Sequence, residues 1–398
     1  MHISERTLNI PTSPIRKLAP IADAAEKAGK KIYHLNIGQP DVETPKSFFE
    51  ATAAFHPKVL SYGKSQGREE LLEAIRKYYL DWGMDFSLDN IYITNGGSEA
   101  ISFAVMTTCD PGDNILMFEP FYANYKSFVG AYNVGINGVP TSPDEGYHLP
   151  PEKEIEKHID SRTRAILLSN PGNPTGVIYT EAEMDMISRI VRKYDLALIA
   201  DEVYREFVYD GKFKSFGTMH ELDDNLIIID SVSKRYSACG ARVGCIISRN
   251  KDLDAQLLKC CQSRLSVSQL DQAGAAGLYT TPKSYWEDVR QEYARRRDTI
   301  KAALDAMPGV ISSQPKGAFY VMVKFPVDDI ETFAKWLLSD FSIDKDTVMI
   351  TPGKGFYASN PDRGKDEARL AYVLNCDALK RAMELLAEGL KQYPGRKK

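Results

Sequence analysis

The chain has 398 residues, a formal net charge of -4 and 43% hydrophobic residues, and these values exclude several classes of protein. Its length exceeds what one ordinary core holds, so we expect two domains. The sequence lacks the Lys/Arg stripe of a nucleic-acid binder and the ~20-residue apolar run of a membrane span, so we expect neither nucleic acid nor a membrane as a partner. It also shows no signal peptide, so we expect a cytoplasmic protein. The six cysteines form no CxxC pair and no zinc-type spacing, so no metal site is expected.

Short apolar runs alternate with helix-length amphipathic segments over most of the chain. A helix is expected from about Thr180, which can cap it because Glu183 follows three residues later. The apolar runs are hydrophobic at every position, which is typical of strands covered on both faces. They lie at residues 91–94, 114–118, 165–169, 196–200 and 226–230. The alternation predicts an α/β fold: a large domain at 46–285 with a central mostly parallel sheet between two helix layers.

The last third of the chain has a different order of elements. A charged helix at 287–307 precedes a strand at 319–323, a helix near 330–338 and a strand at 369–374. We therefore predict a smaller α+β domain at 286–398. Residues 1–45 are expected to form an N-terminal arm and part of that smaller domain.

Polar residues follow the predicted strands of the large domain at the points where the strands end. They include Ser98, Tyr122, Asn173, Asp201 and Lys234. In an open α/β sheet, the carboxyl ends of the strands form the ligand crevice. We therefore expect these distant residues to meet at one site.

Lys234, in the segment Ser231-Val-Ser-Lys234, can become a neutral amine if it is desolvated near other cations. Taken alone, a lysine in such a position is more often a solvated loop residue. The segment also matches the S-x-x-K motif of penicillin-recognising serine enzymes. In those enzymes the S-x-x-K motif precedes the other motifs along the chain, and a K-T-G element is also required. This sequence has no K-T-G element, so that interpretation is rejected.

Gly96-Gly-Ser98 opens a helix directly after a strand, and free N–H groups at a helix start can bind phosphate. The segment is not a G-x-G-x-x-G motif, so nucleotide binding is not supported. Asp201 and Tyr204, taken as isolated residues, are more often structural than chemical.

The complete set of motifs resembles the fold-type I pyridoxal-phosphate (PLP) enzymes, and within them the class I/II aminotransferases. The matching stretches occur in the family's order and span nearly the whole chain. They are Tyr62–Gly67, Gly96–Ala100, Glu119–Tyr122, Asn170–Gly176, Asp201–Tyr204, Ser231–Lys234, Gly240–Gly244 and Glu367–Leu370.

The resemblance implies roles at the cofactor ring. Lys234 would hold PLP as a Schiff base and later act as the base that moves a proton. Asp201 would pair with the protonated pyridine nitrogen and keep the ring an electron sink. Tyr204 and Asn173 would hydrogen-bond the phenolic oxygen, and Tyr122 would stack on the ring.

The resemblance also implies how phosphate and substrate are bound. Arg369 would bind the substrate α-carboxylate as a bidentate partner, with Gly38 and Asn173 nearby. Tyr62 would reach the phosphate from the partner subunit of a homodimer. The remaining phosphate-binding residues would be Gly97, Ser98, Ser231 and Arg242.

The expected function is ping-pong transfer of an amino group from an L-amino acid to a 2-oxo acid, by default aspartate and 2-oxoglutarate. Alternatives are an aromatic or neutral amino acid aminotransferase, a PLP-dependent β-lyase, or a non-catalytic PLP-fold module. Many relatives that accept aspartate have a lysine where this chain has Ser98. Arg16, Lys17 and Lys126 could supply the missing cation, although surface solvation is the more common fate of each.

Overall fold

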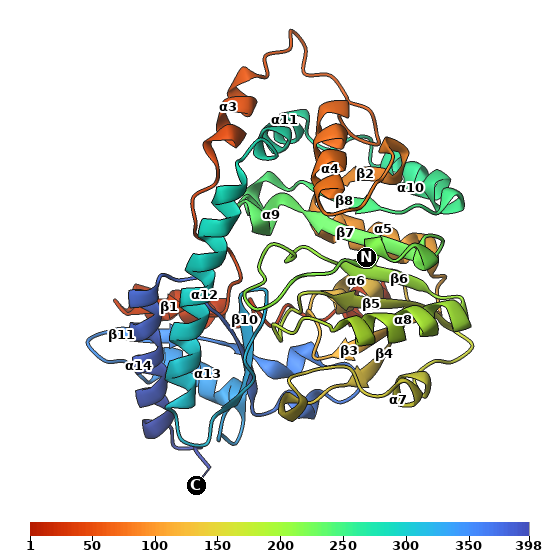
Figure 1. Cartoon of the computed structure of the whole chain (residues 1–398). Coiled ribbons are helices and arrows are strands. Elements are labelled where there is room, and N and C mark those ends of the chain that lie inside the picture. The colour runs from red at the N-terminus through yellow and green to blue at the C-terminus, as the bar shows by residue number, and fades with distance from the viewer. Residues whose placement is uncertain (398) are drawn as a thin grey trace.

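The computed structural model describes residues 1–397, within which the largest element is a seven-stranded sheet (Figure 1). β8 runs antiparallel to its neighbours β2 and β7, and the other neighbouring pairs are parallel. The prediction of a central mostly parallel sheet is therefore confirmed. In spatial order the strands are β2 (Ile91–Thr94), β8 (Gly244–Ile247), β7 (Leu226–Ser231), β6 (Ala197–Asp201), β5 (Thr163–Ser169), β3 (Asn114–Glu119) and β4 (Gly135–Pro140).

Helices cover both faces of this sheet. One face packs on α4 (Glu69–Asp81), α8 (Glu181–Tyr194) and α11 (Gln269–Leu278). The other packs on α5 (Gly96–Thr108), α6 (Tyr125–Gly130) and α10 (Lys251–Ser263). Ile228 packs in the first layer and Ile227 and Ile229 in the second. Both faces of the central strands are thus buried, which explains why the predicted strands are apolar at every position.

The start of α8 agrees with its prediction. Thr180 is the N-cap: its side chain accepts a hydrogen bond from the backbone N–H of Glu183 at 3.2 Å. The Glu183 carboxylate accepts one from the Thr180 N–H at 2.7 Å. This reciprocal pair satisfies two otherwise free donors of the first turn. The same part of the chain also contains α7 (Glu152–Glu156), α9 (Val232–Arg235) and α3 (Lys46–Ala54), the last of which packs against α11.

The C-terminal third forms a second packed unit with α12 (Lys283–Asp305) running into it from the large sheet (Figure 1). Its antiparallel sheet has the order β12 (Thr351–Pro352), β13 (Glu367–Ala371), β10 (Tyr320–Lys324), β9 (Ile311–Ser312). β1 (Lys31–His34) pairs in parallel with β11 (Asp346–Met349). The remaining helices are α1 (Glu5–Asn9), α2 (Ala19–Lys27), α13 (Ile330–Ser339) and α14 (Cys376–Gln392).

Several boundaries in this unit differ from the predicted ones, most of all those of α12 and β13. α12 begins four residues early because Pro282 precedes it as N-cap, where the missing N–H removes no helical hydrogen bond. β13 begins two residues early and ends at Ala371, because its pairing with β10 extends from Glu367 to that residue.

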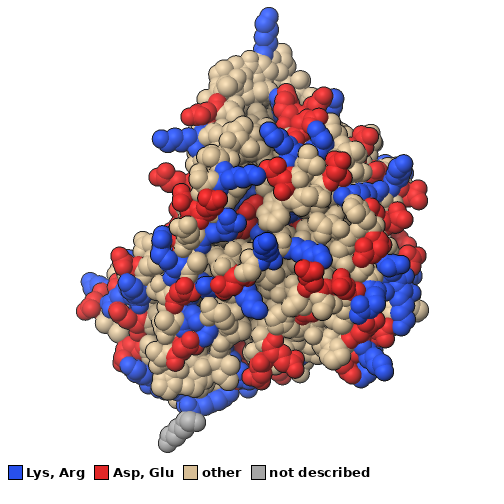
Figure 2. Space-filling view, viewed as in Figure 1, with Lys and Arg blue, Asp and Glu red and all other residues tan. Residues whose placement is uncertain are grey.

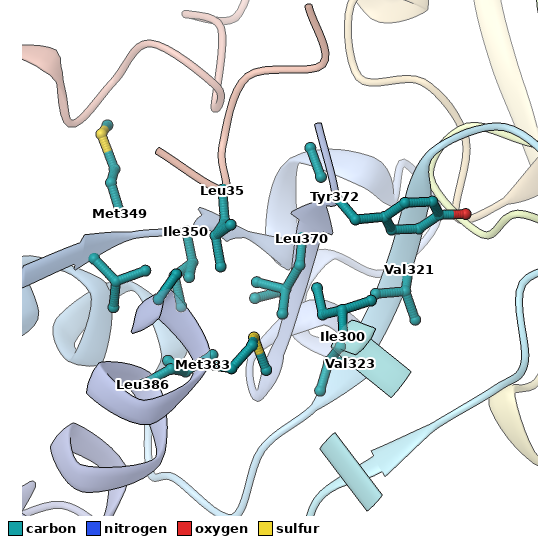
Figure 3. Packing of buried hydrophobic residues seen from close by; sticks show 14 of the residues in the cluster. Leu35, Ile300, Val321, Val323, Met349, Ile350, Leu370, Tyr372, Met383 and Leu386 are labelled. Atoms are coloured by element: carbon teal, nitrogen blue, oxygen red, sulfur yellow. The ribbon is translucent and has the colours of Figure 1, made fainter. Parts of the chain in front are cut away.

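The second unit has its own hydrophobic core, to which the N-terminal segment contributes. Figure 3 shows Leu35 among Val321, Leu370 and Met383, so residues close to the N-terminus pack against β10, β13 and α14. This packing agrees with the expected division at residues 45 and 285, which stays a prediction. No helix within residues 1–397 is both long and apolar enough to cross a membrane.

Candidate active site

A cavity of about 520 Å³ lies at the carboxyl ends of the large sheet's strands, where the second unit meets them. The structure thus brings together polar residues that follow five different strands, as expected for an open α/β sheet. Of the twelve predicted site residues, Tyr62 does not line the cavity and is 81% exposed. The others do line it: Gly38, Gly97, Ser98, Tyr122, Asn173, Asp201, Tyr204, Ser231, Lys234, Arg242 and Arg369.

Lys234 lies on the single turn of α9, which Ser231 caps by accepting a hydrogen bond from the Ser233 N–H at 3.1 Å. Its Nζ donates to the carbonyl oxygen of Gly38 at 2.9 Å and lies 3.9 Å from Cys239 Sγ. At Gly38, a Cβ would lie 1.8 Å from the Tyr320 hydroxyl. Glycine is therefore required for the loop that meets the lysine amine.

Asp201 ends β6 as a buried carboxyl group facing the cavity. It accepts hydrogen bonds from the Tyr125 hydroxyl at 2.6 Å and from the Val203 N–H at 3.3 Å. Burial raises the pKa of Asp201 to about 6, although these two hydrogen bonds oppose the shift. Ionising this buried carboxyl group is costly without a cation beside it, so Asp201 would bind a cationic group in the cavity favourably.

One end of the cavity is suited to an anion. The start of α5 contributes Gly97 and Ser98, and free N–H groups at a helix start attract negative charge. Arg242 lies beside it and donates to the Cys239 carbonyl oxygen at 3.2 Å. Gly96 has φ +75°, and a Cβ there would come within 2.4 Å of the Arg242 guanidinium. The close approach of Arg242 to the helix start therefore depends on Gly96.

Arg369 is buried on β13, on the side of the cavity that the C-terminal unit forms. It donates to Asn173 Oδ1 at 3.1 Å and to the Asn36 carbonyl oxygen at 2.7 Å, and it lies 4.5 Å from the centre of the Tyr320 ring. Its Nε has no hydrogen-bond partner among residues 1–397. This fixed planar cation suits a carboxylate ligand.

The predicted roles of Asn173 and Tyr204 place them together, and the structure brings them into contact. Asn173 Nδ2 lies 3.4 Å from the Tyr204 hydroxyl, which lies 3.0 Å from the Tyr320 hydroxyl. Burial raises the pKa of Tyr204 well above its ordinary value, so its hydroxyl stays protonated.

The site also contains residues that were not among the twelve predicted, and four of them bear on its chemistry. Ser233 and Cys239 line the cavity, as does Tyr320, while Tyr125 supports Asp201 from behind. Two of them stand near residues or strands that are predicted from the sequence. Tyr125 comes three residues after Tyr122, and Tyr320 lies inside a predicted strand that leads into the second unit. Neither spacing reveals which side chain faces a ligand.

Sequence and structure comparisons agree on the family. The family model for aminotransferase class I and II matches residues 30–386. The aspartate aminotransferase of Thermotoga maritima is 29% identical over 98% of this chain and 99% of its own length, and that of Bacillus subtilis is 26% identical over 99% and 100%.

Solved structures of the same family superpose over nearly the whole chain. The alanine aminotransferase of Pyrococcus furiosus has a TM-score of 0.90 at 29% identity, covering 98% of this chain and all of its own. The Thermus thermophilus aspartate aminotransferase with maleate has a TM-score of 0.89 at 25% identity, with the same coverage. The predicted resemblance is thereby confirmed, and the chain belongs to the aminotransferase class I and II family.

Proposed function

We propose that the cavity binds pyridoxal 5'-phosphate and that the enzyme transfers an amino group between an L-amino acid and a 2-oxo acid. The observation that carries the proposal is the convergence of three different groups in one cavity. These are the Lys234 amine, the buried Asp201 carboxyl and the anion-binding end formed by α5 and Arg242. An aldehyde, a pyridine nitrogen and a phosphate are the three groups of this cofactor that such residues would hold.

The residues at both ends of the cavity fit the proposed cofactor. The α5 start, with Gly97, Ser98, Ser231 and Arg242, supplies donors and positive charge for a phosphate dianion. Asp201, whose pKa is raised to about 6 by burial, would be ionised by pairing with a protonated pyridine nitrogen. When bound, the cofactor supplies an electron sink that stabilises negative charge at the substrate Cα.

The side chains around the cavity would then divide the work of transamination. Lys234 would bind the cofactor aldehyde and, once released, would take the proton from the substrate Cα and return it elsewhere. Tyr204 and Asn173 would donate hydrogen bonds to the cofactor's phenolic oxygen, and Tyr122 would lie against the ring. Arg369 would orient the substrate by its α-carboxylate, because its guanidinium is held by Asn36 and Asn173.

We propose aspartate and 2-oxoglutarate as the default substrates, and the two curated relatives named above are aspartate aminotransferases. Ser98 cannot read a distal carboxylate as a lysine would, so another cation is required. Arg16 lines the cavity, and among residues 1–397 no acidic side chain lies within ion-pair distance of it. In contrast, Lys17 pairs with Glu331 at 2.8 Å and Lys126 donates to the Tyr357 carbonyl oxygen. Arg16 is therefore the proposed reader of the distal carboxylate.

A neutral amino acid is the second candidate substrate. Ile15, Ile37, Ile101 and Phe128 also line the cavity, and these apolar side chains suit an uncharged substrate. The name of the Pyrococcus furiosus relative, an alanine aminotransferase, agrees with this alternative.

We also propose that the enzyme is a homodimer in which Tyr62 reaches the partner's cavity. Tyr62 is exposed together with Phe49, Val59 and Leu60. They belong to α3 and the loop after it, at the top of Figure 1, and Figure 2 shows an uncharged area at the corresponding end, below one protruding Lys or Arg side chain. An exposed apolar patch of this kind is typical of an interface between subunits.

The proposal is tested by incubating the PLP-loaded enzyme with a panel of L-amino acids and 2-oxoglutarate. We expect glutamate and the 2-oxo acid of the donor to form in equal amounts, with the highest rate for aspartate. Release of ammonia and pyruvate from cysteine-type substrates without an acceptor would instead indicate a β-lyase. If no donor yields a 2-oxo acid, transamination is the wrong reaction.

A further inference from the structure

The two segments that carry Asp201 and Lys234 also carry a second set of charged side chains, which are buried away from the cavity. Asp201 and Tyr204 line the cavity, whereas Glu202 and Arg205 do not and are fully buried. The same division holds at α9. Lys234 lines the cavity, and the next residue, Arg235, is only 1% exposed. Each short segment therefore joins the site to a buried charged layer behind it.

Asp230 and Arg235 form an ion pair that closes around the turn bearing Lys234. The Asp230 carboxylate pairs with the Arg235 guanidinium and accepts a hydrogen bond from the Ser231 N–H at 2.7 Å. Ser231 is the cap of the same turn. Because one partner precedes Lys234 and the other follows it, the ion pair fixes both ends of the segment on which the amine is mounted.

A second pair ties this turn to the segment that carries Asp201. Arg205 donates to Glu202 at 2.6 Å and to the Tyr79 hydroxyl at 2.9 Å. The Tyr79 hydroxyl in turn donates to Asp230 at 2.9 Å. A continuous chain of contacts therefore runs from the residues beside Asp201, through Tyr79, to the residues on both sides of Lys234.

The charge of Asp230 acts on the site. Burial alone would raise the pKa of Asp230, but Arg235 and Arg205 outweigh it and hold that pKa below its ordinary value. Besides burial, the negative charge of Asp230 contributes to the raised pKa of Asp201, whereas Lys234 opposes that shift. The other titratable groups around the pair are Tyr78 and Tyr79 on α4, Cys245 on β8, Tyr236 directly after α9, Tyr279 directly after α11, and Glu206, which accepts a hydrogen bond from the Tyr78 hydroxyl.

Stability gives little reason to keep this arrangement. A buried ion pair is often no more stabilising than apolar residues of similar size, because desolvating both charges is costly. Arg235 adds to that cost, since its Nε and Nη1 have no hydrogen-bond partner in the part of the chain that the structure describes. Its position directly beside Lys234 points to a role at the site.

We propose that Arg235 is a positioning residue for the cofactor-binding lysine. Paired with Asp230, it holds the turn that carries Lys234 and cancels the negative charge that Asp230 would otherwise present to the cavity. The inference rests on the proposed binding of the cofactor by Lys234, and it adds a buried pair that touches neither cofactor nor substrate.

The test is a pH titration of the visible absorbance of the cofactor bound to the holoenzyme, in wild type and variants. Arg235→Gln leaves the negative charge of Asp230 unbalanced. This charge favours the protonated form of the bond between Lys234 and the cofactor. The midpoint should rise by on the order of one pH unit. Arg235→Lys keeps the charge and should retain the wild-type midpoint. Arg249→Gln, which breaks an ion pair with Asp223 outside the cavity, is the matched control and should not change it.

The double variant Asp230→Asn/Arg235→Gln separates charge from positioning. It is neutral overall, so its midpoint should return to that of wild type. Because it lacks the Asp230–Arg235 ion pair that holds the turn bearing Lys234, it should bind PLP about ten-fold more weakly at equilibrium, the effect of losing one good polar interaction. This variant should fold even if Arg235→Gln does not, because it leaves no unpaired buried charge.

Three results would overturn the inference. One is a folded Arg235→Gln enzyme with the wild-type midpoint, and another is a double variant that binds PLP as tightly as wild type. In both cases the cofactor assignment stands, because wild type still titrates. A wild-type protein that shows no titrating cofactor absorbance would overturn both the proposed function and this inference.

Discussion

The buried carboxyl group of Asp201 leads to a prediction about the stability of the cofactor-free protein. Its pKa is raised from the ordinary 3.8 to about 6 in the folded state, mainly by burial. The fold therefore favours the neutral form. The favourable contribution is complete below about pH 4 and is lost as the pH rises through about 6.

The size of the effect follows from this difference. A shift of about two pKa units corresponds to about 3 kcal/mol of destabilisation when the carboxylate is ionised. Asp201→Asn removes the charge while keeping a side chain that can still accept from Tyr125 or Val203. Allowing ~1 kcal/mol for an imperfect hydrogen bond, we expect the variant to be about 2 kcal/mol more stable than wild type above pH 7, although it loses activity.

Urea denaturation of the cofactor-free proteins at about pH 7.5 and about pH 4.5 measures this effect. The advantage of Asp201→Asn should be present at the higher pH and nearly absent at the lower one. Asp185→Asn, at an exposed position on α8, is the control and should change stability little at either pH. If Asp201→Asn is no more stable than wild type at the higher pH, or if its advantage is equal at both pH values, ionised Asp201 does not destabilise the folded protein.

Three further predictions concern substrate and subunit contacts. Arg16→Gln should raise the KM for aspartate about ten-fold or more and leave that for alanine unchanged, whereas Lys17→Gln should affect neither; steady-state kinetics with both donors checks this, and equal KM changes for the two donors would contradict it. Arg369→Lys should lower kcat/KM for every amino acid by about 100-fold, because an ammonium cannot replace the bidentate guanidinium; a variant near wild-type efficiency would remove Arg369 from the α-carboxylate site. Sedimentation should show a dimer, and Tyr62→Phe should weaken PLP binding while the protein stays dimeric; a monomeric active enzyme would disprove the interface role of Tyr62.

The fold could be predicted well from sequence where burial leaves a simple pattern. The strands of the large sheet are apolar at each position because helices cover both faces. Strand–helix alternation then required their carboxyl ends to meet at one edge. The convergence of Asp201 and Lys234 followed from that geometry, and the roles of the individual residues came from the resemblance to a known family.

The sequence could not reveal contacts that depend on three-dimensional packing. Tyr125 supports Asp201 across 76 positions of sequence, and no local pattern connects them. Arg235 follows Lys234 in a polar segment that would suit a solvated turn equally well. It is buried against Tyr78 of α4, whose ring centre lies 4.3 Å from the Arg235 guanidinium and which comes from a distant part of the chain.

The most direct test of the account is to locate the lysine that binds the cofactor. Borohydride reduction of the PLP-loaded enzyme would make the bond between cofactor and lysine permanent, and peptide mass mapping would then identify the modified residue. We expect one modified lysine, Lys234, and no visible cofactor absorbance in Lys234→Ala. Modification of a different lysine, or a fully active Lys234→Ala enzyme, would contradict it.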